Sequence, residues 1–316
     1  MPLKVVLALL FVITVWGGSF PVAKLALAEI SPINLATLRF TLASLLFLPV
    51  MGLSLRRTGA KLPRPAGRDL LQLHLLALLG VTTYFMVQYT AVSLTTASNA
   101  GLLIAVSPLF VALFAALFLG ERLTPAKIAG IGVAMGGVAA VISRGTFRFS
   151  FGSAHLAGDL LMILNALCWA LFSILGKRMM QRYSPLVTTF YITLFGTLWF
   201  YPVALPLGVL PAALRLSPAG WWAVAFLGAF CSVGGYYFWY WGLSQVEASR
   251  VAVFQYLQPL VSFALSALLL GEEANLATLG GGLLIITGVV LATRAPTAKP
   301  QEAALKTITR TVTREK

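Results

Sequence analysis

Charged side chains are scarce in this sequence. They make up 10% of its 316 residues, whereas 59% are hydrophobic. A soluble domain of this length cannot bury so many apolar side chains, so the composition excludes a soluble globular protein. The alternating pattern of a transmembrane barrel strand is also missing, which leaves helices as the structure that satisfies its own backbone in lipid. The sequence therefore predicts an all-α integral membrane protein.

Cysteine and histidine are almost absent, with two residues of each. Cys168 and Cys231 lie within apolar runs, where cysteine behaves as a small hydrophobic side chain, so they indicate neither a disulfide framework nor a metal site. His74 and His155 lie far apart without an acidic pair beside them, which argues against an integral-membrane enzyme. We expect no catalytic residue, no metal and no cofactor.

Acidic residues number nine, and all fall at the ends of apolar runs, in loops or in the tail. Carriers coupled to protons or sodium commonly place a carboxylate or a histidine within the membrane. The sequence has no such residue, although an acid at the end of a run, such as Asp159, stays open as a coupling group. Uniport or a backbone-based ion site fits equally well.

Long apolar runs are what the sequence has in abundance. A bilayer core of ~30 Å needs about 20 apolar residues per helix. Ten such runs are predicted, at residues 5–23, 33–53, 69–91, 99–119, 125–143, 156–176, 186–207, 219–243, 250–270 and 276–293. The first run resembles a signal peptide, but its counterpart lies in the middle of the chain, so both are interpreted as permanent spans.

Basic residues outnumber acidic ones by 23 to 9, and this net charge of +14 could suggest nucleic-acid binding. Their positions contradict that interpretation, because most lie in alternate loops, as between Arg56 and Arg68, or in the tail at 295–316. The bias follows the positive-inside rule and predicts a multi-pass protein of the cell inner membrane with both termini cytoplasmic. The expected partners are the lipid bilayer and a small-molecule substrate, and the tail is expected to be disordered.

The first half of the chain recurs in the second at a nearly fixed spacing. Adding 153 takes Trp16 to Trp169, and further along the offset drifts to 151. Each copy has five predicted spans, and an odd number forces the second copy to insert upside down. We therefore predict two inverted five-helix repeats, at residues 1–147 and 148–294.

Inverted repeats are a recurring design of secondary transporters, with a substrate site near the membrane midplane where the repeats meet. Polar groups at membrane depth are costly in lipid and tend to face such a cavity. We predict an aromatic, weakly polar substrate cavity formed by Trp16, Ser19, Tyr84, Gln88, Asn99, Ser107, Trp169, Ser173, Tyr236, Tyr240, Gln255, Tyr256 and Gln258. For the glutamines and tyrosines, hydrogen bonds between helices are the alternative role.

Two prolines occupy equivalent positions inside spans four and nine. Pro108 and Pro259 each remove one backbone hydrogen bond and release the carbonyls of Ile104 and Gln255. A kink needed for packing and a kink that opens the cavity both stay open as interpretations. In either case a freed carbonyl needs a partner or a wet cavity.

Arg39 is the one basic residue well inside a predicted span. It lies about two turns from the end of span two, so it can snorkel to the interface or pair with Glu29. The alternative is contact with a substrate carboxylate. Lys24, at the end of span one, is expected to anchor the helix at the interface.

Small residues recur at helical spacing in spans five and ten, as at Gly132, Gly136, Gly280 and Gly288. Such residues let helix backbones approach closely. We expect these two spans to pack together within one chain, with a homodimer seam as the second interpretation.

A set of short motifs occurs in the same order in both halves, in degenerate form in the second. In the first half they are Trp16-Gly17, Ser19-Phe20, Lys24, Ser31-Pro32, Arg39-Phe40, Ala97-Ser98, Ser107-Pro108-Leu109 and Gly120-Glu121-Arg122. Through these motifs, residues 5–293 resemble the EamA-type exporters of the drug/metabolite transporter superfamily. The resemblance implies ten helices in two inverted repeats, with spans five and ten at the periphery of a central cavity.

The resemblance also implies export of amino acids, related metabolites or drugs from a bacterial inner membrane. The leading hypothesis is a secondary transporter that exports small metabolites, amino acids first, by alternating access around a midplane cavity. A multidrug carrier is one alternative. A nucleotide-sugar or phosphometabolite antiporter would need more cationic groups than Arg39 and Arg250, and a passive channel also stays open.

Overall fold

The computed structural model describes residues 2–59, 61–65, 67–107, 109–110, 113–114, 117, 125–142, 153–245, 254, 257–272 and 275–294. All regular elements in these ranges are helical, which confirms the predicted all-α class. The described elements of the first half are α1 (Leu3–Ala26), α2 (Pro32–Thr58), α3 (Arg68–Ala77), η1 (Leu78–Thr83), α4 (Tyr84–Leu94), α5 (Ala97–Leu103), η2 (Ile104–Val106) and α7 (Pro125–Ile142). Those of the second half are α8 (Ala154–Arg182), α9 (Pro185–Ala204), α10 (Val209–Arg215), α11 (Pro218–Ala225), η3 (Phe226–Gly234), α12 (Gly235–Gln245), α14 (Gln258–Leu270) and α15 (Leu276–Arg294).

Six of the described helices are long and apolar enough to cross a membrane. They are Leu3–Ala26, Pro32–Thr58, Arg68–Leu94, Ala154–Phe172, Leu186–Ala204 and Pro218–Trp239. Four shorter apolar helices coincide with the other predicted runs, at Ala97–Val106, Ile128–Val141, Gln258–Leu270 and Leu276–Gly288. The third and eighth predicted spans are each one continuous rod in which a π-helical segment, η1 or η3, separates two α-helical parts.

Three helices begin at a Ser-Pro pair. The Ser31 hydroxyl accepts a hydrogen bond from the backbone N–H of Asn34, and Ser217 accepts one from Gly220 at 3.1 Å. Ser184 starts α9 in the same way. Serine satisfies an amide that has no partner inside the helix, and proline fits the first turn because it lacks the N–H. These pairs therefore fix where α2, α9 and α11 begin.

Helices α2 and α9, which hold equivalent places in the two halves, pack against each other in opposite directions. Asn34, near the start of α2, donates to the carbonyl of Leu207 beyond the end of α9, at 3.4 Å. Farther along α2, the Ser44 hydroxyl lies 2.8 Å from the Thr197 hydroxyl, nearer the start of α9. Residue numbers therefore increase along α2 in the direction in which they decrease along α9, so the two helices are antiparallel.

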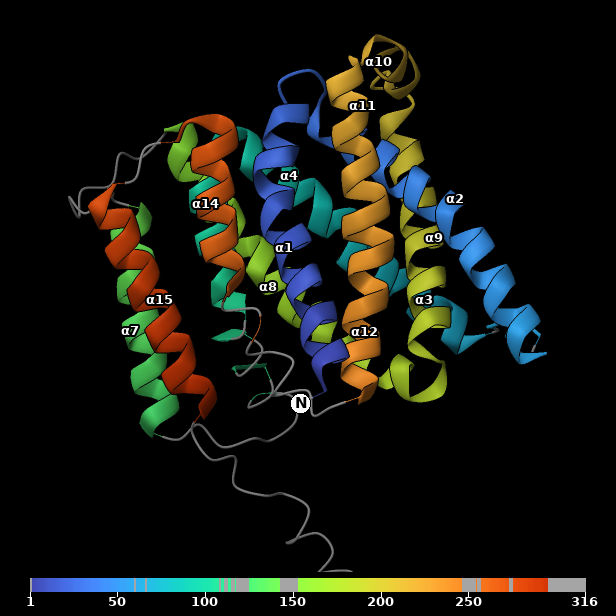
Figure 1. Cartoon of the computed structure of the whole chain (residues 1–316), viewed down its shortest axis with the longest axis horizontal. Coiled ribbons are helices and arrows are strands. Elements are labelled where there is room, and N and C mark those ends of the chain that lie inside the picture. The colour runs from blue at the N-terminus through green and yellow to red at the C-terminus, as the bar shows by residue number, and fades with distance from the viewer. Residues whose placement is uncertain are drawn as a thin grey trace, which may run out of the picture.

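Helices α7 and α15 form a second antiparallel pair, which lies at one side of the bundle (Figure 1). A Cβ on Gly288 would lie 2.4 Å from the Gly130 carbonyl oxygen, and one on Gly281 would lie 2.8 Å from that of Gly137. The backbones touch only because these positions lack side chains. The prediction that spans five and ten pack together within one chain is confirmed.

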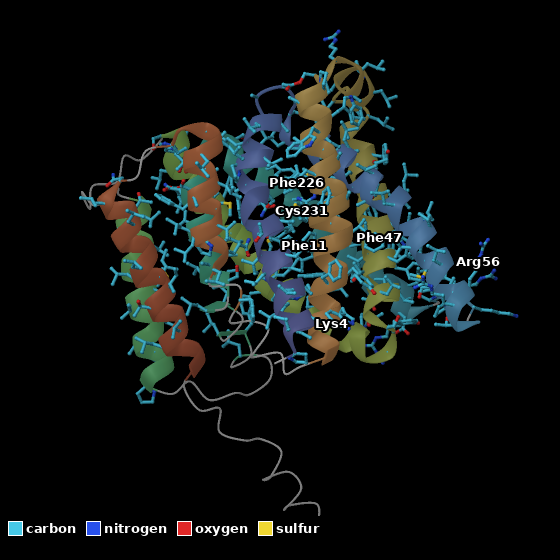
Figure 2. The ribbon with its side chains drawn as sticks, viewed as in Figure 1. Lys4, Phe11, Phe47, Arg56, Phe226 and Cys231 are labelled. Carbon is cyan, nitrogen blue, oxygen red and sulfur yellow. The ribbon has the colours of Figure 1, made fainter. Side chains whose placement is uncertain are left out.

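Helix α1 lies near the middle of the view, where it contacts α14 on one side and α12 on the other (Figure 1). Cys231 is part of η3 (Figure 2), and its thiol donates to the Val15 carbonyl of α1 at 3.1 Å. Both cysteines are free and buried, in agreement with their predicted role as small core side chains. Lys4 lies in the first turn of α1, near the bottom of the bundle, and Arg56 lies near the end of α2, at the right of the view (Figure 2).

Candidate functional site

A cavity lies where α1, α2, α4, η2, α8, α12 and α14 meet. Its free space is about 70 Å³. One water molecule needs about 10–15 Å³ on the same measure, so the cavity has room for about five water molecules. Its lining consists of Trp16, Ser19, Phe20, Arg39, Tyr84, Phe85, Gln88, Ile104, Ala105, Ser107, Trp169, Tyr236, Gln258 and Pro259.

The structure brings most of the predicted site residues to this one cavity. Those present are Trp16, Ser19, Arg39, Tyr84, Gln88, Ser107, Trp169, Tyr236, Gln258 and Pro259. Gln255, Tyr256 and Pro108 lie outside the described residues, as do the side chains of Ser173 and Tyr240. Phe20, Phe85, Ile104 and Ala105 line the cavity without having been predicted, although Phe20 follows Trp16 by four residues and so shares its helical face.

Asn99 is placed elsewhere. It is buried, and its side-chain amide lies 3.4 Å from both carboxylate oxygens of Asp159. The Thr95 hydroxyl donates to the same carboxylate at 2.5 Å. Asn99 lies in the first turn of α5 and precedes Ser107 by about 12 Å of rise, so it belongs to the polar cluster at that end of the helix and not to the cavity.

Pro259 lies at the start of the described part of span nine, and most of the span before it lies outside the described residues, so the predicted kink there stays a prediction. Helix α14 begins at Gln258, and Pro259 occupies its first turn, where a backbone N–H has no partner to lose. In the first half, the carbonyl of Ile104 does find a partner, because the Ser107 hydroxyl donates to it at 2.5 Å. The short 3₁₀ segment η2 lies at this point.

Both π-helical segments lie next to a cavity tyrosine. Segment η1 ends just before Tyr84, and η3 ends one residue before Gly235, which precedes Tyr236. A π-helical turn inserts an extra residue and changes the direction of the side chains that follow, and such turns occur frequently at functional sites. In η3 it also directs Ser232 toward α2, where its hydroxyl accepts from Arg39 at 2.9 Å.

Trp16 is the centre of an aromatic wall. Its ring centroid lies 6.5 Å from that of Trp169, at 77°, and 5.7 Å from that of Tyr236, at 65°. The Trp16 indole N–H donates to the Cys231 carbonyl at 3.0 Å, which fixes the ring. A Cβ on Gly235 would lie 2.4 Å from that indole nitrogen, so glycine is required for α12 to approach so closely.

Arg39 points into the protein. Its side chain is 4% exposed, and its guanidinium donates to the Tyr89 hydroxyl at 2.5 Å and to Ser232. The guanidinium carbon lies 4.4 Å from the centroid of the Phe85 ring, a cation–π contact. The expectation that Arg39 snorkels or pairs with Glu29 is therefore wrong, because the neighbouring helices α4 and η3 supply polar and aromatic partners at depth.

Lys24 also differs from its predicted role as an interface anchor. Its ammonium donates to the carbonyls of Val92 and Thr95, at 2.6 and 2.5 Å, and reaches that of Ser93. These carbonyls lie at the C-terminal end of α4, where the last carbonyls of a helix have no intrahelical N–H partner. The helix dipole also favours a cation at this end. Lys24 thus ties α1 to α4.

The acids of the described residues are held at the helix ends, away from the cavity. Glu29 accepts from the backbone and hydroxyl of Ser217, at 2.8 and 2.7 Å, and these bonds hold the pKa of Glu29 below its usual value. Glu272 accepts from the backbone of Ala97 and Ser98, and from the Ser98 hydroxyl at 2.6 Å.

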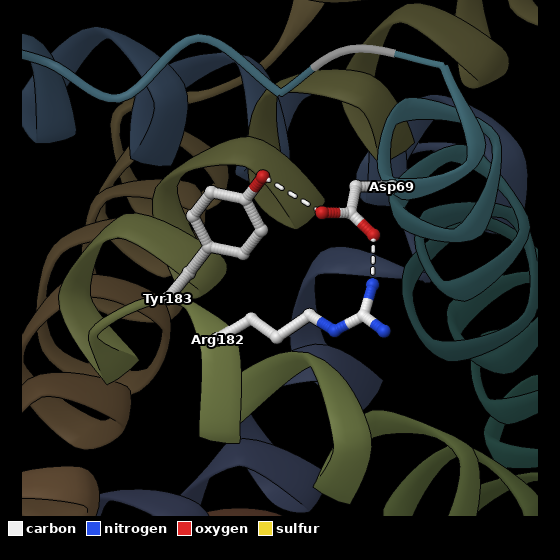
Figure 3. A network of polar contacts seen from close by, with 3 residues as sticks. All are labelled: Asp69, Arg182 and Tyr183. Atoms are coloured by element: carbon white, nitrogen blue, oxygen red, sulfur yellow. Dashed lines mark hydrogen bonds and ion pairs between the residues drawn. The ribbon is translucent and has the colours of Figure 1, made fainter.

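Asp69 joins α3 to the end of α8 (Figure 3). It pairs with Arg182 at 2.5 Å and accepts from the Tyr183 hydroxyl at 3.0 Å. This hydrogen bond is the main reason why the pKa of Tyr183 is raised. The pair is a contact between the two halves at one end of the bundle, and Asp69 is therefore not a cavity group.

The model of the EamA-like transporter family matches the chain twice, over residues 3–143 and 156–294. An uncharacterized transporter of Archaeoglobus fulgidus is 37% identical over 92% of this chain and 97% of its own length. A probable terminal-alkyne amino-acid exporter of Streptantibioticus cattleyicolor is 29% identical over 95% of this chain and 97% of its own length. A crystal structure with 22% identity has the same fold, with a TM-score of 0.64 over 93% of this chain and 97% of the other.

Proposed function

The chain belongs to the EamA-like transporter family, and from this premise we propose that it exports small metabolites, amino acids first, by alternating access between two inverted five-helix repeats. The observation that carries the proposal is the position of the cavity between elements of both halves. Trp16 and Trp169, equivalent residues of the two halves, both line it and contact each other. A substrate held there would contact both repeats, which take turns in opening the site to the two sides of the membrane.

A twofold axis in the membrane plane would make equivalent residues meet. Ser44 and Thr197, 153 residues apart, share a hydrogen bond between α2 and α9. In the pair formed by α7 and α15, a Cβ added to Gly288 would contact Ala134, and a Cβ added to Gly137 would contact Ile285. With an offset of 151, Ala134 corresponds to Ile285 and Gly137 to Gly288. The two contacts are thus exchanged copies of one another, the signature of a twofold interface.

Arg39 gives the cavity its preference for a carboxylate. A guanidinium carries five N–H donors. Among the described residues, Tyr89 and Ser232 accept from two of its nitrogens, so donors remain for a ligand that enters the cavity. A planar fork of this kind matches a carboxylate. The S. cattleyicolor relative, named as a probable exporter of an amino acid, supports the same substrate class.

A phosphorylated or nucleotide-sugar substrate is less well supported. Such a substrate carries more negative charge and more atoms than an amino acid. The described lining contains one cationic side chain, Arg39, and about 70 Å³ of free space. The size and charge of the cavity therefore favour a small monocarboxylate.

The test is flux of a panel of radiolabelled amino acids through the purified protein in proteoliposomes, with and without a pH gradient. We expect saturable flux of at least one amino acid, and its loss in Arg39→Gln. Arg215→Gln is the matched control, since it removes the same charge from the exposed end of α10. Full flux in Arg39→Gln, or no amino-acid flux in the parent protein, would overturn the proposal.

The topology can be tested separately. Both termini are proposed to be cytoplasmic, which places Thr58, at the end of α2, and Asn275, just before α15, on opposite membrane faces. Thr58→Cys and Asn275→Cys should react with an impermeant thiol reagent from opposite sides. Labelling of both from the same side would contradict inverted repeats.

A further inference from the structure

Asn165 is a buried polar side chain on α8 that the fold leaves unpaired. It is 0% exposed, and among the described residues neither its amide oxygen nor its amide nitrogen has a hydrogen-bond partner. Ala154, the first residue of α8, precedes it by 11 residues, or about 17 Å of rise, so Asn165 lies about halfway across a bilayer core of ~30 Å. An unpaired amide is costly at that depth, because lipid offers no replacement for the missing hydrogen bonds.

Asn165 lies directly behind one wall of the cavity, although it does not line the cavity itself. Trp169 does line it, and it follows Asn165 by four residues, so the two side chains share a face of α8. The hydroxyl of Tyr84, another lining residue, is close to the Asn165 amide where α4 packs against α8. Gln88 also lines the cavity and donates to the Tyr84 hydroxyl at 3.3 Å. The two halves of the chain thus place three uncharged polar groups together at this wall.

The acids near this wall are already bound to other groups. Asp159 precedes Asn165 by six residues, or about 9 Å along α8, and it accepts from the Thr95 hydroxyl at 2.5 Å. Glu272 accepts from the first amides of α5. Among the described residues, an amino group in the cavity must therefore be recognised by uncharged acceptors, and an amide oxygen with two lone pairs is such an acceptor.

We propose that Asn165 is a specificity residue of the transporter, whose amide oxygen accepts from the ammonium group of a small amino acid while Arg39 holds the carboxylate. The proposal rests on the proposed function, because it names the residue that recognises the other end of the same substrate. Entry of the substrate turns the Tyr84 side chain away from α8, which exposes the amide and adds volume to a cavity that otherwise has room for about five water molecules. A ligand with N–H donors supplies the missing hydrogen bond, whereas a ligand without them leaves the buried amide unpaired.

Stability distinguishes a ligand-binding amide from a structural one. Asn165→Leu keeps the branched shape of the side chain and removes the unpaired polar atoms, so it should unfold at a higher fraction of dodecyl sulfate in mixed micelles than the parent protein. Asn99→Leu makes the same change at a buried asparagine whose amide is bonded to Asp159, and it should unfold at a lower fraction. A loss of stability in Asn165→Leu as large as that in Asn99→Leu would overturn the proposal, because the amide would then have a structural role.

Transport identifies the ligand group that the amide recognises. The probe is radiolabelled glycine in proteoliposomes, with unlabelled glycine and propionate as competitors, since propionate has a methyl group in place of the ammonium. In the parent protein glycine should compete about tenfold or more strongly than propionate. In Asn165→Leu and in Asn165→Ala, the KM for glycine should rise about tenfold or more, and the two competitors should become equally effective.

Thr188→Val is the matched control for transport. It replaces another buried polar atom without a partner by a side chain of the same shape, on α9 and outside the cavity, so the KM for glycine should not change. An unchanged KM in both Asn165 variants would overturn the role of Asn165. Equal competition by glycine and propionate in the parent protein would also do so, as would a parent protein that carries other amino acids and not glycine.

Failure of this inference can be told apart from failure of the proposed function. Amino-acid flux that is indifferent to the Asn165 variants would refute the specificity residue and leave the transporter proposal intact. Absence of flux for every amino acid of the panel in the parent protein would refute both.

Discussion

Replacement of Gly288 by alanine tests the crossing of α7 and α15. A Cβ at this position would lie 2.4 Å from the backbone oxygen of Gly130 and 2.4 Å from the backbone nitrogen of Ala134. Ordinary carbon contacts are about 3.5–4.0 Å, and backbone atoms cannot rotate away as a side chain can. The two helices must therefore separate by about 1 Å along a stretch where they now touch.

The cost is that of inserting a methyl group into a closely packed site, about 1–3 kcal/mol. Gly280→Ala is the matched control, since it makes the same chemical change on the same helix at a position with no atom within 4 Å. There, alanine should be neutral or stabilise the helix by up to about 1 kcal/mol. The measurement is the free energy of unfolding in mixed micelles with increasing dodecyl sulfate, followed by circular dichroism. If both variants unfold at the same detergent fraction, the close crossing of α7 and α15 is refuted.

Three further changes test separate contacts. Ser44→Ala should cost about 1 kcal/mol in the same unfolding assay, because it leaves one fewer partner for the buried Thr197 hydroxyl, and no effect would contradict that contact. Glu272→Gln should lower stability by about 1 kcal/mol, because it removes the negative charge that accepts from the first amides of α5; unchanged stability would count against that contact. The pKa of Glu29 is lowered, so its contribution to stability is complete above the usual value of 4.5 and is lost as the pH falls through the folded-state pKa. Unfolding midpoints measured over this pH range should depend less on pH in Glu29→Gln than in the parent, and equal dependence would refute the role of Glu29.

Most of the cavity could be predicted from sequence because its residues are exceptions to the apolar background. Trp16, Gln88 and Gln258 interrupt long apolar runs, and polar or amphipathic groups at membrane depth must find a cavity or a partner. The interruption alone does not distinguish these two outcomes. Asn99 shows the limit, since it meets the same criterion and yet bonds to Asp159.

The inward direction of the Arg39 side chain could not be predicted from the sequence, and the reason is general. Sequence fixes how deep a residue lies along a helix, but a membrane helix that is apolar on all sides gives little indication of which face turns inward. Depth alone favoured snorkelling to the nearby interface. Tyr89 and Ser232, which are distant in sequence, decide the direction, and Ser232 has its position through the π-helical turn of η3.

The amino-acid sequence by itself determined the helical class and the approximate limits of the described long helices. These properties follow from local causes: lipid requires every backbone group to be satisfied within its own segment, and Ser-Pro pairs set helix starts. The tertiary structure alone decided that Arg39, Trp16 and Trp169 share one cavity. It also decided that Lys24, Asp159 and Glu272 are bound outside that cavity. Those outcomes depend on how each helix is rotated against its neighbours, and that rotation is set by packing between residues far apart in the chain.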